Sequence, residues 1–132
     1  MSTLAESFTV YIIDDDASVR SGLARLMRSA KLPSRCFASP EAFLAVAETA
    51  TDGCVLLDLT MPHMSGTELQ AHLRNMQFKL PVIVVSANDS EDGRQAALAL
   101  GASFFLRKPV DDQALIDAIH WVTEASASGQ RG

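Results

Sequence analysis

The feature that most constrains this chain is a repeated alternation between a short apolar run and a longer amphipathic segment. The short runs, such as residues 54–57 and 81–85, are apolar on both faces, which is typical of strands covered on both sides. The amphipathic segments place apolar residues at helical spacing. Such alternation predicts right-handed βαβ units and a parallel sheet with helices on both faces. The fold class is therefore doubly wound α/β, although the pattern alone leaves the strand order open.

Five strands and five helices are predicted, and they divide the chain into one folded domain with two short flanks. The strands are residues 8–13, 34–38, 54–57, 81–85 and 103–107, and the helices are 17–30, 40–50, 67–74, 89–100 and 111–125. We expect an N-terminal extension over residues 1–8, one domain over 9–125, and a small, polar, linker-like tail over 126–132.

Charge and hydropathy exclude several classes of protein. The net charge of −5 argues against nucleic-acid binding through overall charge, because such binding needs clustered Lys and Arg. There is no apolar run near the roughly 20 residues that cross a bilayer, and the first residues do not resemble a signal peptide. Cytoplasm is therefore the expected location, with no membrane association. Cys36 and Cys54 form no CxxC pair and are expected to be buried thiols.

The predicted strands, apart from the second, are followed by polar residues that suit phosphoryl chemistry. Because the carboxyl ends of parallel strands share one edge of the sheet, we expect these side chains to converge. Clustered carboxylates repel one another unless a cation is bound, and their hard oxygens suit Mg²⁺. A carboxylate can also act as the nucleophile that forms an aspartyl-phosphate, and a lysine can neutralise the transferred oxygens. The residues are Asp14, Asp15 and Asp16 after the first strand, Asp58 after the third, Ser86 after the fourth and Lys108 after the fifth.

Four motifs together resemble the receiver domains of two-component response regulators. They are IIDDD at 12–16, LLDLTMPHMSG at 56–66, VVSAN at 84–88 and GASFFLRKP at 101–109, and they occur in the order found in that family. The resemblance covers the chain from about Thr9 to Ala125. It is strongest to nitrogen-fixation-type regulators, which carry a helix-turn-helix output domain.

The resemblance implies a flavodoxin-like sheet of strand order 2-1-3-4-5 and a defined metal and phosphoryl site. Asp58 would accept the phosphoryl group from a sensor histidine kinase. Lys108 and Ser86 would contact that group, and the Lys108–Pro109 peptide bond would be cis. The ion would be Mg²⁺, with Mn²⁺ as a substitute. Its implied protein ligands are Asp15 and Asp58 directly, Asp14 largely through water, and the backbone carbonyl of Thr60.

The resemblance also implies a switch. Ser86 would move to the phosphoryl oxygens, Phe105 would turn into the space left, and the face formed by residues 89–100, 103–107 and 111–125 would change. That face would bind partners, including a second copy of the chain, and would control transcription through a domain absent from this chain. Many relatives have Thr in place of Ser86, and some have Tyr in place of Phe105. Thr60 and Asn88 would line the path of attacking water and set the phosphoryl lifetime.

Three other functions fit the residues less well. A metal-dependent phosphatase with an aspartyl nucleophile needs a second Asp two residues later, where this chain has Thr60. A pseudo-receiver would lack an acidic ligand, the acceptor or the lysine. A nucleotide-binding domain would show GxGxxG or GxxxxGK[ST]. The sequence thus favours a switch that catalyses its own phosphorylation and dephosphorylation rather than an enzyme acting on a separate substrate.

Overall fold

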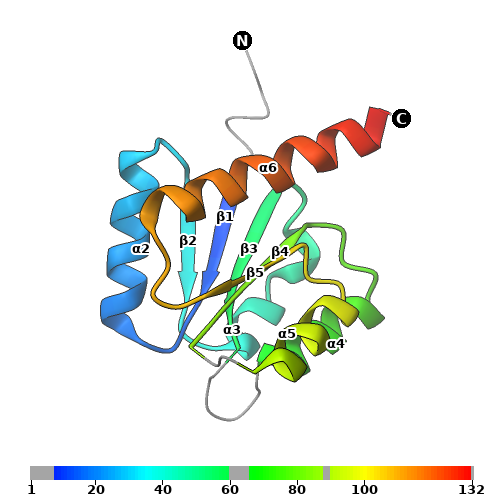
Figure 1. Ribbon diagram of the computed structural model, residues 1–132. Helices are drawn as coiled ribbons and strands as arrows, with labels where there is room; N and C mark the ends of the chain where they lie inside the picture. Colours follow the sequence, from blue (N-terminus) through cyan, green and yellow to red (C-terminus); the bar gives the residue numbers. More distant parts are fainter. Residues whose placement is uncertain (1–7, 60–65, 88–89, 132) are drawn as a thin grey trace.

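The central sheet has five parallel strands in the order β2-β1-β3-β4-β5, which confirms the predicted fold class and strand order. The structure is a computed structural model that describes residues 8–59, 66–87 and 90–131, and only the backbone of 125–131 (Figure 1). The strands are β1 (Thr9–Ile13), β2 (Ser34–Phe37), β3 (Gly53–Asp58), β4 (Val82–Ser86) and β5 (Phe104–Arg107).

Helices cover both faces of this sheet. Helices α2 and α6 lie on one face, and α3, α4 and α5 lie on the other (Figure 1). Their bounds are α2 (Ala17–Ser29), α3 (Pro40–Leu44), the 3₁₀ helix η1 (Ala47–Thr49), α4 (Gly66–Asn75), α5 (Glu91–Ala99) and α6 (Asp112–Arg131). No helix in the described part of the chain is both long and apolar enough to cross a membrane.

Alternation along the strands divides the interior into two cores. On β1, Val10 and Ile12 pack toward α2 and α6, whereas Tyr11 and Ile13 pack toward α3, α4 and α5. Successive side chains of a strand point to opposite faces, so each central strand contributes to both cores. The second core contains Phe43, whose ring packs edge-on against that of Phe78 at 5.8 Å between centroids.

Two helix ends differ from the prediction. The helix expected over residues 40–50 ends at Leu44, and η1 follows it. The Val46 N–H donates to Phe43 O and the Thr49 N–H to Val46 O, so the backbone tightens to three-residue spacing around two β-branched residues of lower helix propensity. This arrangement keeps both Phe43 and Ala47 buried.

The last helix is longer than expected. We predicted a helix end near residue 125 and a linker-like tail over 126–132, yet α6 continues through Arg131 (Figure 1). Since the segment holds no proline, its backbone can extend the hydrogen bonds of the preceding helix despite the low helix propensity of Ser and Gly.

The expectation of two buried thiols is wrong for one of them. Cys54 is buried in β3, but Cys36 is exposed. Cys36 lies on β2, which is an edge strand and is largely exposed at its middle positions. The Cys36 Sγ lies 3.9 Å from the carbonyl oxygen of Arg20 in α2.

Candidate functional site

Carboxylates from two adjacent strands meet at one edge of the sheet. Asp58 is the last residue of β3, and Asp14 directly follows β1, which pairs with β3. Carboxylate oxygens of Asp14, Asp15 and Asp58 all lie within 4.8 Å of one another. Asp14 and Asp58 are 3% and 8% exposed, whereas Asp15 is exposed. The cluster is therefore buried on one side and open to solvent on the other.

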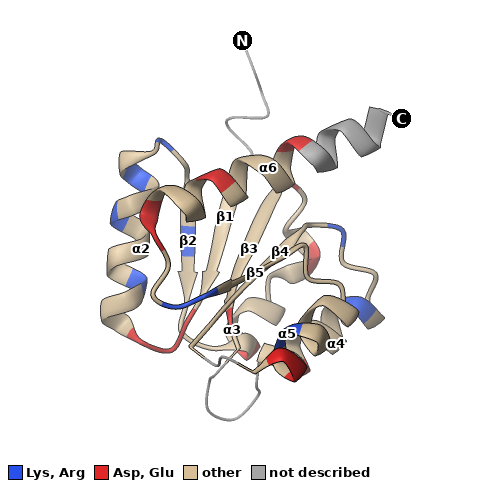
Figure 2. Ribbon diagram, in the orientation of Figure 1, with Lys and Arg blue, Asp and Glu red and all other residues tan. Residues whose placement is uncertain are grey.

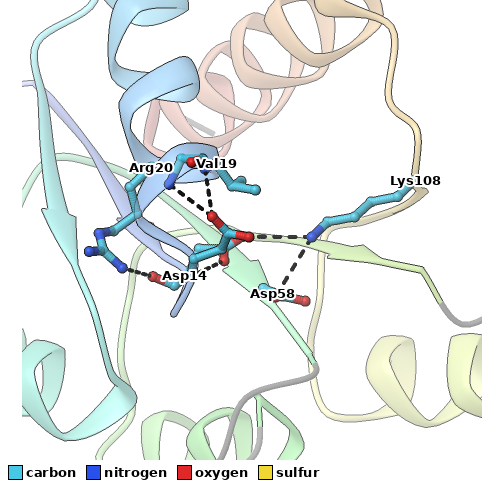
Figure 3. Close-up of polar contacts among 7 residues, drawn as sticks. Asp14, Val19, Arg20, Asp58 and Lys108 are labelled. Atoms are coloured by element: carbon cyan, nitrogen blue, oxygen red, sulfur yellow. Dashed lines mark hydrogen bonds and ion pairs between the residues drawn. The ribbon is translucent and has the colours of Figure 1, made fainter.

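Lys108 reaches into this cluster from the segment after β5. Its Nζ lies 3.7 Å from Asp14 Oδ2 and 3.7 Å from Asp58 Oδ2, so one ammonium group bridges two carboxylates (Figure 3). The Lys108 N–H donates to Ser86 O at 2.9 Å, which fixes its backbone to the end of β4. The Lys108–Pro109 peptide bond is cis, the conformation that the resemblance implies.

Local hydrogen bonds hold Asp14 in place. Its N–H donates to Phe37 O at 3.1 Å, and its Oδ1 accepts the Asp16 N–H at 2.9 Å. Asp16 caps α2 by accepting the N–H groups of Ser18 and Val19, so its carboxylate supports the helix start. This anchors the start of α2 beside the acidic cluster.

Arg20 is a supporting residue that sequence reasoning missed. Its Nη1 donates to the carbonyl oxygen of Asp14 at 2.6 Å (Figure 3). The available signal was its position one helical turn after the Asp16 cap, which directs a long basic side chain toward the end of β1. Figure 2 shows the acidic residues where β1 ends and the basic residues along α2.

Strand alternation divides the predicted site residues between the two faces of the sheet. Asp14 and Asp58 lie two residues after Ile12 and Leu56, so they share the face on which these two residues pack toward α2 and α6. Ser86 follows Val84, which packs toward the other face, and it is fully buried. Phe105 pairs with Val84 across the β4–β5 ladder and packs, partly buried, on that same face.

A cavity of about 520 Å³ opens beside the acidic cluster, between α2 and α6. Asp14, Asp58 and Lys108 line it together with apolar side chains such as Val19 and Leu115. Sequence reasoning missed this cavity because helical periodicity gives the apolar face of a helix but not how closely two helices approach.

Gly66 holds the start of α4 against the end of β3. Its N–H donates to Leu59 O at 3.0 Å, and a Cβ at this position would lie 2.5 Å from Leu59 Cα and 2.8 Å from Asp58 O. Only a glycine permits this close approach to the strand that carries Asp58. The two predicted lifetime-tuning residues, Thr60 and Asn88, lie outside the described residues, as does the expected Thr60 carbonyl ligand.

The donor set fits a hard divalent cation. Three carboxylates within reach of one another, one of them exposed, provide oxygen ligands while leaving room for water, which is the arrangement that Mg²⁺ prefers. Lys108 offsets part of the negative charge of Asp14 and Asp58.

Comparison with known proteins agrees with this geometry. Residues 10–120 match the profile of the response regulator receiver domain. This chain belongs to the response regulator receiver domain family. It is therefore a signalling domain of two-component systems, and its homologues include transcriptional regulators.

The relatives include two transcriptional regulatory proteins. TdiR of Thauera aromatica is 44% identical over 113 residues, covering 85% of this chain and 49% of TdiR. FixJ of Rhizobium meliloti (strain 1021) is 35% identical over 117 residues, covering 89% of this chain and 57% of FixJ. The chain spans about half the length of these curated relatives.

Two solved structures share both sequence and fold with this receiver domain. The crystal structure of FixJ-N is 35% identical with a TM-score of 0.84, covering 89% of this chain and 94% of FixJ-N. Full-length FixJ from B. japonicum is 30% identical with a TM-score of 0.87, covering 94% of this chain and 61% of that one.

Proposed function

We propose that this receiver domain accepts a phosphoryl group on Asp58 from the phosphohistidine of a sensor histidine kinase in the cytoplasm. The observation that carries the proposal is the position of the Asp58 carboxylate, 3.7 Å from Lys108 Nζ and within a cluster of three carboxylates. Phosphoryl transfer needs a positioned nucleophile and neutralisation of the transferred oxygens, and this arrangement offers both.

The acidic cluster would hold Mg²⁺, with Mn²⁺ as a substitute. Asp15 and Asp58 would be direct ligands, Asp14 would act largely through water, and the backbone carbonyl of Thr60 would complete the protein ligands. Bound there, the ion would neutralise oxygens of the phosphoryl group.

Asp58 is the proposed nucleophile, as the family resemblance implies, and Asp14 has a supporting role. Asp14 Oδ1 accepts the Asp16 N–H and Asp14 Oδ2 faces Lys108, so the Asp14 carboxylate helps to hold the site together. An Asp58 oxygen would attack phosphorus in line with the leaving imidazole. The new O–P bond forms as the donor's P–N bond breaks, and the imidazole nitrogen keeps the electron pair. The Lys108 ammonium would then pair with a phosphoryl oxygen.

Hydrolysis would reset the switch when a water molecule attacks the same phosphorus and releases Asp58 and inorganic phosphate. We propose that Thr60 and Asn88 line the approach of this water and thereby set the rate. Thr60→Lys and Asn88→Ala should therefore change the decay rate of the phosphorylated chain. Unchanged decay in both variants would remove this part of the proposal.

Phosphorylation would be transmitted through Ser86 and Phe105. The two residues lie on the same face of the sheet, on adjacent strands, and Phe105 is only partly buried. A movement of Ser86 toward the phosphoryl oxygens would open space for the Phe105 ring and alter the face formed by α5, β5 and α6. We propose that this face then binds partners, including a second copy of the chain.

The output of the switch is proposed from the named relatives. Because TdiR and FixJ are transcriptional regulatory proteins, we propose that this domain controls transcription through a domain outside this chain. Residues 9–125 would form the receiver domain and 126–132 its connection to that output. With a net charge of −5, the receiver domain itself is not expected to bind nucleic acid directly.

The deciding experiment is incubation with Mg²⁺ and acetyl phosphate, followed by intact-mass measurement. Wild type should gain one phosphoryl group, Asp58→Asn should gain none, and Asp117→Asn, a matched change on the exposed side of α6, should behave as wild type. A wild-type chain that takes up nothing would indicate a pseudo-receiver. Rapid release of phosphate from unrelated monoesters would indicate a phosphatase.

A further inference from the structure

Asp15 is the one exposed carboxylate of the acidic cluster, and its side chain has no partner that holds it. An Asp15 carboxylate oxygen lies within 4.8 Å of those of Asp14 and Asp58, yet it makes no hydrogen bond or ion pair to another described residue. Asp14 and Asp58 differ in this respect, because Lys108 bridges them. The position of the Asp15 carboxylate therefore depends on its backbone.

Side chains hold both peptide units that flank Asp15. Arg20 Nη1 donates to the carbonyl oxygen of Asp14 at 2.6 Å, which fixes the peptide unit before Asp15 (Figure 3). The Asp16 N–H donates to Asp14 Oδ1 at 2.9 Å, which fixes the peptide unit after Asp15. Because the backbone of a residue turns only about φ and ψ, holding both neighbouring peptide units limits where the Asp15 carboxylate can lie.

Arg20 is itself anchored at the start of α2. Its N–H donates to Asp16 O at 3.0 Å, and the Asp16 carboxylate accepts the N–H groups of Ser18 and Val19. The Arg20 side chain is half-buried and forms no ion pair with a carboxylate of any described residue. The hydrogen bond of its guanidinium to a neutral carbonyl beside the acidic cluster therefore fixes the backbone and does not neutralise a carboxylate.

We propose that Arg20 is a positioning residue that orients Asp15 to bind a divalent cation. The inference rests on the metal role proposed for Asp15, but it does not depend on phosphoryl transfer. Loss of an outer-shell partner of a metal ligand weakens metal binding by about 10–100-fold. The positive charge of Arg20 has the opposite effect, since it repels a cation. Loss of the charge alone would strengthen cation binding and loss of the hydrogen bond would weaken it, so the sign of the change separates the two effects.

The test is a titration with Mn²⁺, in which electron paramagnetic resonance measures the free ion and no phosphorylation is needed. Arg20→Met should bind Mn²⁺ about fivefold to tenfold more weakly than wild type, because the lost charge offsets part of the effect of the lost hydrogen bond. Arg25→Met is the matched control, since it removes an exposed arginine from the same helix, and it should bind Mn²⁺ as wild type does. Far-UV circular dichroism should show that both variants are folded.

A double variant tests whether Arg20 acts through Asp15. Asp15→Asn alone should weaken Mn²⁺ binding, and adding Arg20→Met should not weaken it further, because the carboxylate that Arg20 positions is already gone. In the metal-free chain, the ¹⁵N shift of the Asp15 amide should change more in Arg20→Met than in Arg25→Met. That nitrogen belongs to the peptide unit whose oxygen loses the Arg20 donor.

The dependence of phosphorylation on Mg²⁺ gives a second readout. With acetyl phosphate, Arg20→Met should need about fivefold to tenfold more Mg²⁺ to reach half of its maximal rate. Its rate at saturating Mg²⁺ should be close to that of wild type, whereas a general distortion of the site would lower that rate as well.

The proposal is overturned if folded Arg20→Met binds Mn²⁺ as tightly as wild type or more tightly. Equal weakening by Arg20→Met in the wild-type and Asp15→Asn backgrounds would also overturn it, because Arg20 would then act independently of Asp15. A failure of the proposed function would look different. Wild type would then bind Mn²⁺ but take up no phosphoryl group, and weaker Mn²⁺ binding by Arg20→Met would still support the positioning role.

Discussion

Replacement of Gly66 by alanine tests whether α4 must touch the end of β3. A Cβ on residue 66 would lie 2.5 Å from Leu59 Cα and 2.8 Å from Asp58 O, and both of these are backbone atoms. Neither atom can move by a change of rotamer, so either α4 or the end of β3 must shift. Gly66→Ala therefore changes the position of the strand end that carries the proposed phosphoryl acceptor.

The expected loss of stability can be estimated from two opposing effects. Overpacking of a closely packed site costs about 1–3 kcal/mol. Alanine regains less than about 1 kcal/mol of helix propensity, because residue 66 is the first of α4. We expect a net decrease of about 2 kcal/mol in the free energy of unfolding. Gly22 is the matched control, since it lies within α2 with no atom within 4 Å of an added Cβ, and Gly22→Ala should gain about 1 kcal/mol.

Urea denaturation of the three proteins measures both changes. With a slope of about 2 kcal/mol per molar urea, Gly66→Ala should unfold about 1 M earlier than wild type, and Gly22→Ala about 0.5 M later. Gly66→Ala should also take up less phosphoryl group from acetyl phosphate, whereas Gly22→Ala should be unaffected. If the free energy of unfolding of Gly66→Ala lies within about 0.5 kcal/mol of the wild-type value while Gly22→Ala is stabilised, the packing argument at Gly66 is wrong.

Further experiments test other parts of the structure. Lys108→Met should slow phosphorylation about tenfold or more in the intact-mass assay, because the transferred oxygens lose their positive partner; an unchanged rate would contradict the proposed role. Iodoacetamide at pH 8 should modify Cys36 and leave Cys54 unmodified, because only the Cys36 thiol is exposed. Desolvation raises the pKa of Cys36, and the charge of Arg20 partly opposes this rise, whereas burial raises the pKa of the Cys54 thiol to about 12. Modification of the native Cys36→Ser variant would refute this. The Cys54 thiol should also contribute less to the free energy of unfolding above pH 9, because there it ionises in the unfolded chain before it ionises in the folded one. Lys31 and Gln77 have positive φ angles of 62° and 58°, a left-handed conformation that is strained for residues with a Cβ. Lys31→Gly and Gln77→Gly should therefore each raise the free energy of unfolding by about 1 kcal/mol in thermal denaturation, and a decrease in both would show that these positions are not strained.

The fold class could be predicted from the residues because the inner strands of the sheet, such as β3, are buried on both faces, whereas the helices are buried on one. The apolar run at 54–57 and the helical spacing after Ala17 express those two environments directly in the sequence. The side of β1 on which β2 lies has no such local signature, so the strand order came from the resemblance. The break between α3 and η1 was missed for a related reason. Local propensity at Val46 and Thr49 favours the break only weakly, so the sequence pattern did not reveal it.

The site was predictable to the extent that strand ends determine it. Asp14, Asp58 and Lys108 meet because parallel strands deliver their carboxyl ends to one edge, and the structure brings them within ion-pair distance. The alternation of side chains along β4 and β5 already places Ser86 and Phe105 on the face opposite to Asp14 and Asp58. Predicting this also requires the register between the two strands, which the sequence alone does not give. The Arg20 contact depends on where a long side chain extends from a docked helix, which a linear pattern does not specify.

The adjacent positions of β1 and β3 have a consequence for how the molecule assembles. Asp14 and Asp58 are neighbours in space but belong to different βα units, so neither half of a chain divided before Gly53 would carry both carboxylates. Fragment complementation would therefore regenerate the acidic cluster only when β3 docks beside β1. Recovery of divalent-cation affinity in mixed fragments would thus show that β1 and β3 have paired. Cation binding would then measure the formation of the native strand order without an added label.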